Sequence, residues 1–215
     1  FDNFVSYSQI SIEVDANQST YVYAAADPGS FFFDNISMSI TSGYIAKLSP
    51  NGSWEWASEL TSYNSEASIA LKSNGELLVA TNNLILSFDQ SGITQTEFAF
   101  YPSNGHFQIE DLELDHSDNI FLGGYFSGSL SINVNGSNMN YYSAYARLFT
   151  LKIDSNGVYE WFSTASFPTS SSMARSISLD GNGSVYVAGY FYGYLELGVS
   201  SLSTGGTQHG FVAEL

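Results

Sequence analysis

The chain of 215 residues contains no cysteine, so disulfide bonds do not stabilise it and it has no Cys–His pair. Basic residues are scarce as well: five Lys and Arg stand against 21 Asp and Glu, for a formal net charge of −16. A surface of this sign repels phosphate, which argues against nucleic acids and anionic membranes as partners. No apolar run approaches the roughly 20 residues of a transmembrane helix, so we expect no insertion into a membrane.

Catalytic motifs are missing too. Neither a GxSxG nor an HExxH pattern occurs, and the three histidines, His106, His116 and His209, are scattered along the chain. We therefore expect a protein that is not an enzyme and needs no cofactor.

The sequence does contain a repeated pattern. Residues 179–191, LDGNGSVYVAGYF, read as the end of a strand, a four-residue turn and an alternating second strand. The same pattern follows Val14, Leu71 and Leu114. Downstream of each copy lies a five-residue apolar block, at residues 44–48, 84–88, 149–153 and 211–215. Turns such as Asp154-Ser155-Asn156-Gly157 follow the first three blocks and lead to further strands, which contain Trp56 and Trp161.

Each repeat thus holds four short strands, and no helical period occurs anywhere. We predict an all-β fold, a β-propeller of four repeat units with four-stranded antiparallel blades. The chain is expected to form a single propeller domain over residues 1–215. Its predicted parts are a closing strand (1–7), blade 1 (8–67), blade 2 (68–105), blade 3 (106–170) and blade 4 (171–215).

Repeats 1, 3 and 4 carry an extra segment between their second and third strands. These segments begin near Ser30, Ser129 and Tyr194, and each continues through a small polar turn to a further apolar residue. We expect them to form extra hairpins that project from the blade edge and carry part of the chain's abundant Tyr and Phe.

The motifs in residues 189–215, GYFYGYLELGVSSLSTGGTQHGFVAEL, resemble the SBBP family of secreted bacterial and archaeal β-propeller repeats. The blocks YIAKLSPNGSWEWA and LDGNGSVYVAGYF are similar to the same repeat, and the resemblance covers essentially the whole chain. It implies an extracellular or cell-surface protein, and it implies no reaction and no catalytic residues. The family's arrays tend to have more than four repeats, so a fragment of a larger repeat protein is an alternative.

Repeat 4 lacks a strand after residues 211–215, whereas residues 1–7 precede the first repeat. We predict that residues 1–7 pair antiparallel with residues 211–215 and close the ring. The alternative is that the segment completes the last blade of a neighbouring copy and so builds filaments or a surface layer.

Several acidic residues are candidate metal ligands. Asp15, Asp115 and Asp180 recur at the first turn position, where they either cap the turn or form a weak calcium site. Asp111 and Glu113 lie in the densest acidic run and are expected to share one face of a strand lining a central channel. There they either hold a cation or form a solvated wall; an enzyme acting on polysaccharide through this channel is the less favoured alternative.

Five Asn-x-Ser sequons are candidate glycosylation sites, at Asn17, Asn35, Asn51, Asn135 and Asn182. Together these features predict a secreted or cell-surface propeller that acts as a structural, adhesive or binding module. Its expected partner is a protein or a glycan at the cell surface, or a second copy of the chain.

Overall fold

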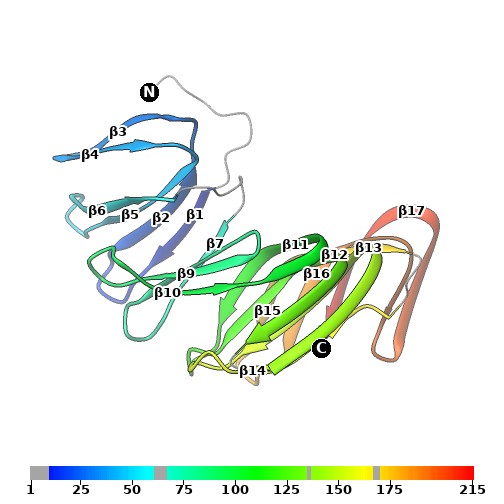
Figure 1. Cartoon of the computed structure of the whole chain (residues 1–215). Coiled ribbons are helices and arrows are strands. Elements are labelled where there is room, and N and C mark those ends of the chain that lie inside the picture. Colours follow the sequence, from blue (N-terminus) through cyan, green and yellow to red (C-terminus); the bar gives the residue numbers. More distant parts are fainter. Residues whose placement is uncertain (1–9, 61–66, 135–136, 167–169) are drawn as a thin grey trace. The chain divides into compact units, whose positions relative to one another are not determined.

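The computed structural model describes residues 10–60, 67–134, 137–166 and 170–215. All regular structure in these ranges is β: seventeen strands form antiparallel sheets, with no helix among them (Figure 1). The predicted all-β class is therefore confirmed. The predicted closing strand, residues 1–7, lies outside the described residues.

The first sheet has the order β1-β2-β5-β6, and its strands are joined by tight turns and by an insertion after β2. Its strands are β1 (Ile10–Val14), β2 (Thr20–Ala25), β5 (Gly43–Leu48) and β6 (Trp54–Glu59). The insertion is a separate two-stranded sheet of β3 (Gly29–Phe33) and β4 (Ile36–Ile40), as predicted for the first repeat.

The second sheet has the order β10-β9-β8-β7 and no insertion. Its strands are β7 (Ala67–Leu71), β8 (Leu77–Thr81), β9 (Leu84–Phe88) and β10 (Thr94–Ala99). Only Asn82 and Asn83 join β8 to β9, and Asn82 has a positive φ of 41°, a conformation that Asn tolerates in tight turns.

The third sheet has the order β11-β12-β13-β14, and its first three strands are much longer. Its strands are β11 (Tyr101–Leu114), β12 (Ile120–Val134), β13 (Ser137–Ile153) and β14 (Tyr159–Thr164). The fourth sheet has three strands in the described part of the chain, β15 (Ser171–Leu179), β16 (Val185–Leu197) and β17 (Ser200–Glu214).

The insertions of repeats 3 and 4 are therefore not separate hairpins, and this part of the prediction needs correction. They continue the second and third strands of their own sheets past a bulge. In the third sheet, residues 144–146 bulge out between the pairs Phe126–Arg147 and Gly128–Ser143. In the fourth, residues 204–207 bulge out between the pairs Tyr192–Gln208 and Tyr194–Ser203. A bulge absorbs the extra residues and lets pairing resume beyond it.

The four-residue turns predicted after the first strand of every repeat and after the third strands of repeats 1 to 3 are present. In the turn after β13, the Gly157 N–H donates to the Asp154 carbonyl at 2.9 Å, and Gly157 has a φ of 79°. Gly accepts this left-handed conformation at little steric cost, which explains its place at the fourth position.

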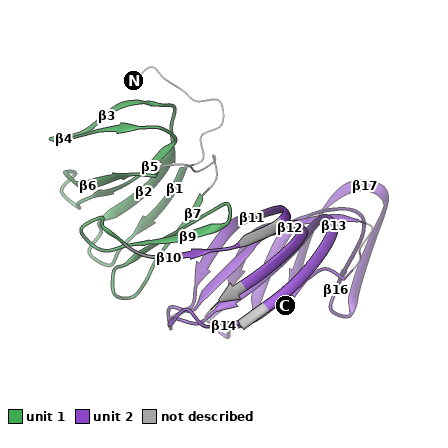
Figure 2. Ribbon diagram, in the orientation of Figure 1, with its two compact units in different colours: residues 1–97 green, residues 98–215 purple. Residues whose placement is uncertain are grey.

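The chain forms two compact units, residues 1–97 and residues 98–215 (Figure 2). In the first unit, a buried cluster joins the first and second sheets; it contains Tyr21, Ile45, Trp56, Ile69 and Val79. In the second unit, a cluster between the third and fourth sheets contains Phe121, Leu148, Ile177, Val187 and Phe211. Each of the two units is compact by itself. That residues 1–215 form a single propeller domain stays a prediction.

Trp56 and Trp161 occupy matching places, as the repeat predicted. Trp56 of β6 pairs with Lys47 of β5, and Trp161 of β14 pairs with Lys152 of β13. Each indole packs edge-on against an aromatic ring of the second strand of its sheet, Trp56 against Tyr21 and Trp161 against Phe121. In both pairs the ring centroids are 6.1 Å apart. Trp56 is buried and Trp161 is half-buried, so burial is confirmed fully for the first and partly for the second.

No helix among the described residues is long and apolar enough to cross a membrane.

Candidate functional site

The turn aspartates bind the backbone of their own turns. The Oδ1 of Asp180 accepts the N–H groups of Asn182 at 2.8 Å and Ser184 at 2.9 Å. Asp15 and Asp115 accept the equivalent pairs of N–H groups. The backbone N–H groups of Ser184 and Asn182 lower the pKa of the Asp180 carboxyl, because these bonds favour the charged form.

These turns therefore use one oxygen of each predicted metal ligand for capping. In the ranges that the structure describes, no group of three or more His, Cys, Asp or Glu side chains is placed to hold a metal ion. The calcium sites proposed for Asp15, Asp115 and Asp180 stay a prediction, and turn capping is what their geometry supports.

Asp111 holds two strands together. Its Oδ2 accepts the Ser176 hydroxyl and the Ile177 N–H of β15, both at 2.9 Å, and its Oδ1 accepts the Leu112 N–H at 3.0 Å. A carboxylate with three donors inside one unit has little left with which to hold a cation. Glu113 follows two residues later on β11, half-buried, as strand alternation predicts.

An ion pair beside Asp111 was not anticipated from the sequence. The Arg175 guanidinium donates to Glu110 Oε2 at 2.6 Å and to the Tyr190 hydroxyl at 3.1 Å. The side chain of Glu110 is only 6% exposed. Burial opposes the charge of Arg175, but Tyr190 and Glu110 outweigh it, and the net effect is to raise the pKa of Arg175. These groups stabilise the junction between β11 and β15.

Four of the five predicted glycosylation sites can be placed. Asn17, Asn35, Asn51 and Asn182 are all exposed in turns, where an attached glycan would meet no packed neighbour. Asn135 lies outside the described residues. Exposure is compatible with modification, and use of these sites stays a prediction.

Two arms extend the third and fourth sheets, residues 127–146 and residues 192–207. Together they contain one charged residue, Glu196, in a chain whose formal net charge is −16. Three tyrosines of these arms are exposed: Tyr142 by 68%, Tyr145 by 49% and Tyr192 by 54%. Tyr145 lies in the bulge of the third sheet's arm, where its carbonyl accepts the Ser143 hydroxyl at 2.7 Å.

The arms that carry these exposed rings are otherwise rich in Ser, Asn, Thr and Gly residues. Tyrosine offers a large rigid apolar face together with a hydroxyl, and it is enriched where proteins bind partners. Sequence reasoning placed aromatic residues on the extra segments; it missed the bulge that brings Tyr145 to the surface, because a bulge leaves no mark in the apolar alternation.

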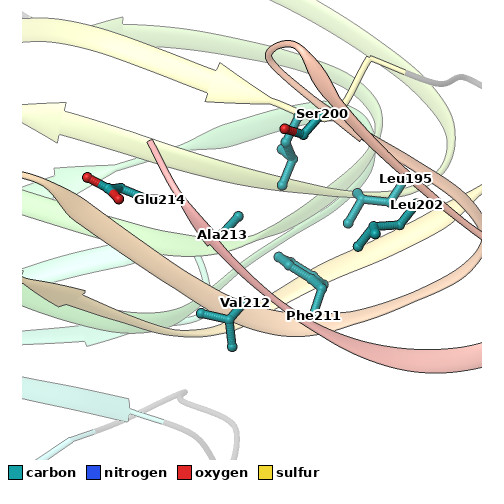
Figure 3. A pocket seen from close by; sticks show the side chains of 8 residues that line it. Leu195, Ser200, Leu202, Phe211, Val212, Ala213 and Glu214 are labelled. Carbon is teal, nitrogen blue, oxygen red and sulfur yellow. The ribbon is translucent and has the colours of Figure 1, made fainter.

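A groove of about 380 Å³ lies against β17 (Figure 3). Leu195, Leu202 and Phe211 supply apolar walls, and Ala213 and Glu214 line the end of the strand. β17 is the outermost strand of the fourth sheet among the described residues. The groove therefore combines apolar side chains with the free edge of a strand, two features that together favour an added strand.

No protein-family model matches the chain, and no curated protein matches it in sequence. Among solved structures, a protein of unknown function from Bacteroides caccae is similar, with a TM-score of 0.47 and 10% identity, over 85% of this chain and 71% of that one. A streptogramin B lyase gives a TM-score of 0.44 and 13% identity, over 93% and 67%. The extracellular domain of the one-component system BT4673 from B. thetaiotaomicron gives 0.36 and 12%, over 84% and 31%.

Scores this low carry no argument about what the chain does or how its sheets are arranged. The resemblance to the SBBP repeats stays a prediction.

Proposed function

We propose that the chain is a non-catalytic binding module that acts outside the cell or at its surface. The observation that carries this proposal is the pair of nearly uncharged arms with Tyr142, Tyr145 and Tyr192 exposed. Exposed aromatic rings on arms of neutral polar residues suit uncharged polar partners, either a neutral glycan or the polar surface of a protein. Five sequons and the predicted resemblance to secreted repeats support the proposed extracellular location.

We also propose that the chain catalyses no reaction. The acidic residues that would serve an enzyme are engaged in structure: Asp111 binds β15, and Glu110 binds Arg175. Binding rather than turnover is therefore the role that the described side chains support best.

We further propose that the scaffold of this module is a closed four-bladed propeller. Strand β1 provides support, because Ile12 is 58% exposed whereas the residues at its place in the other first strands, Ile69, Leu112 and Ile177, are only 2–3% exposed. Each of these residues stands two positions before the end of its strand. A large aliphatic residue that is buried in three sheets and exposed in one favours a further sheet against β1, and ring closure would supply it.

A glycan and peptide array probed with the full chain tests the function. The triple variant Tyr142→Ala, Tyr145→Ala, Tyr192→Ala should bind roughly 10 to 2,000 times more weakly, at about 0.5–1.5 kcal/mol for each ring. Val158→Ala, which changes an exposed apolar residue in the turn between β13 and β14, is the control and should bind as the wild type does. Equal binding by the triple variant and the wild type, or wild-type binding only to anionic ligands, would contradict the proposal.

A further inference from the structure

The hairpin of β3 and β4, in the first unit, packs one of its faces on the first sheet. Phe33 is only 5% exposed, and its ring centroid is 4.9 Å from that of Tyr44 and 5.1 Å from that of Trp54. The turn of the hairpin is anchored as well, because Asp34 Oδ2 accepts the Trp54 N–H at 2.9 Å. These contacts hold the hairpin against β5 and β6.

The opposite face of the hairpin is open and uncharged. Phe32 is 77% exposed, more than any of the exposed tyrosines of the arms. Its cross-strand partner is Ser37, and the pair Ser30–Ser39 shares its face, because side chains alternate along a strand. All three serines are exposed. A phenyl ring, which has no polar group of its own, is thus presented to solvent on a face whose other residues are serines.

A glycosylation sequon, Asn35-Ile36-Ser37, lies in the same hairpin. Its hydroxyl residue, Ser37, is the residue opposite Phe32. Asn35 is an exposed turn residue two positions earlier, which is the diagonal position relative to Phe32. Diagonal neighbours across an antiparallel pair are about 7–8 Å apart, within reach of an aromatic side chain. A sugar attached to Asn35 would therefore start close enough to contact the Phe32 ring.

The sequon at Asn182 offers a contrast. Residues 179–185, LDGNGSV, contain no aromatic residue. The Asn182 Nδ2, the atom that a glycan would modify, donates to Asp180 Oδ2 at 3.4 Å. Its two neighbours, Gly181 and Gly183, offer no side chain on which a sugar could pack. Asn182 therefore serves as the comparison for Asn35.

We infer that Asn35 is an N-glycosylation site at which the first sugar of the attached glycan packs on the ring of Phe32. In the transfer, a bond forms between Asn35 Nδ2 and the anomeric carbon while the bond from that carbon to the phosphate of a lipid-linked sugar donor breaks. The phosphate leaves with the electron pair, and Nδ2 gives up one proton.

The chemistry of the outer face suits a sugar. The C–H groups on one side of a pyranose form an apolar surface that fits an aromatic ring, and its hydroxyl groups can bond to the serine hydroxyls beside Phe32. The glycan removes the exposed ring from water, which stabilises the folded hairpin. The inference rests on the proposed location outside the cell, because lipid-linked donors act on exported chains, and it is independent of what the arms bind.

Two full-length variants test the site. Each retains one sequon, Asn35 in the first and Asn182 in the second, and has Gln at the other four sequon asparagines. Each is secreted from a eukaryotic host cell, and the same variant produced in a bacterial cytoplasm is its unglycosylated reference. Peptide mapping by mass spectrometry measures occupancy, and thermal unfolding compares the two forms.

The Asn35 variant should carry a glycan that raises its melting temperature by about 2–4 °C. The gain should remain after an endoglycosidase trims the glycan to its first sugar, and Phe32→Ser should remove it. This substitution should not disturb the fold itself, because Phe32 is exposed and lies outside the packed face. In the matched Asn182 variant, the glycan should leave the melting temperature unchanged.

Three results would overturn the inference: a secreted Asn35 variant without a glycan, an equal gain in both variants, or a gain that survives Phe32→Ser. Failure of the arms to bind any ligand on the array would count against the proposed function and would leave these measurements unaffected.

Discussion

Glu110 and Arg175, which form the ion pair between β11 and β15, are the extra residues of two equivalent β-bulges. On β11 the pairing with β12 skips Glu110, between the pairs of Ile109 and Asp111. On β15 the pairing with β16 skips Arg175, between the pairs of Ala174 and Ser176. A bulge turns its extra residue out of the ladder. Because both sheets bulge at the same place, the two turned-out side chains meet at 2.6 Å.

Arg175→Met should destabilise the chain by roughly 1–3 kcal/mol, because it leaves the buried carboxylate of Glu110 without this cation. The exposure of Arg175 keeps the expected value below that of a fully buried pair. Urea unfolding at pH 7 measures the change. Adding Glu110→Gln should recover part of the loss, since the two residues are coupled; a double variant with the summed loss of both single variants would contradict this pairing.

Gly189→Ala should destabilise the chain by about 3 kcal/mol or more, because the new Cβ would lie 2.0 Å from the Met173 carbonyl oxygen and 3.0 Å from the Phe211 ring. Gly181→Ala is the matched control, since nothing lies within 4 Å of its Cβ position, and it should change stability by less than about 0.5 kcal/mol. Thermal unfolding compares the two. Similar melting temperatures for both variants would show that β15 and β16 can separate at little cost.

The turn aspartates should make stability fall in acid. Backbone N–H groups, that of Val158 first for Asp154 and that of Ser184 first for Asp180, hold the pKa of both carboxyls below the usual value. The unfolded pKa is about 3.9, so their contribution is complete above about pH 4 and is lost as the pH falls through the lower, folded pKa.

Melting temperatures between pH 2.5 and 7 measure this effect. The double variant Asp154→Asn, Asp180→Asn should lose less stability below pH 4 than the wild type does. Asp27→Asn, at an exposed residue between β2 and β3, should follow the wild-type curve. If both variants lose as much melting temperature below pH 4 as the wild type does, the turn carboxylates are not the cause of the acid destabilisation.

Chelation should leave the melting temperature unchanged, because Asp15, Asp115 and Asp180 direct their Oδ1 atoms to the N–H groups of their own turns. The measurement is thermal unfolding with EDTA, then with excess calcium. A drop of several degrees that calcium restores would show a bound ion, since a ligand of the folded form stabilises it by mass action.

Much of the strand plan follows from sequence alone. The first strands end at Val14, Leu71, Leu114 and Leu179, as the repeated turns predicted. Three of these turns begin with a capping Asp and two end with a Gly of positive φ, and both features favour a turn over a longer strand. The alternation of large apolar residues likewise placed Trp56 and Trp161 on fourth strands.

The features that the sequence did not predict depend on one to three extra residues in β-bulges, which leave the apolar pattern intact. The bulges at Glu110, at Arg175 and around Tyr145 shift the pairing by one or a few positions, and both sides of each bulge keep their alternation. Sequence reasoning also missed that the Asp111 carboxylate binds Ser176 and Ile177 of β15, more than 60 residues away along the chain. The predicted channel beside Asp111 stays a prediction.

The distribution of cations has a consequence for how copies of the chain behave in solution. Four of the five cationic side chains, Lys47, Lys72, Lys152 and Arg175, form ion pairs with glutamates of their own unit at 2.6–2.9 Å. Most of the 21 acidic residues therefore have no lysine or arginine to balance them, and the long-range field of each molecule is negative. This field reaches about one Debye length, roughly 8 Å at physiological ionic strength and about 30 Å at 0.01 M salt. Colloidal repulsion should thus hold copies apart most strongly in dilute buffer, and any encounter between them should become faster as salt is added.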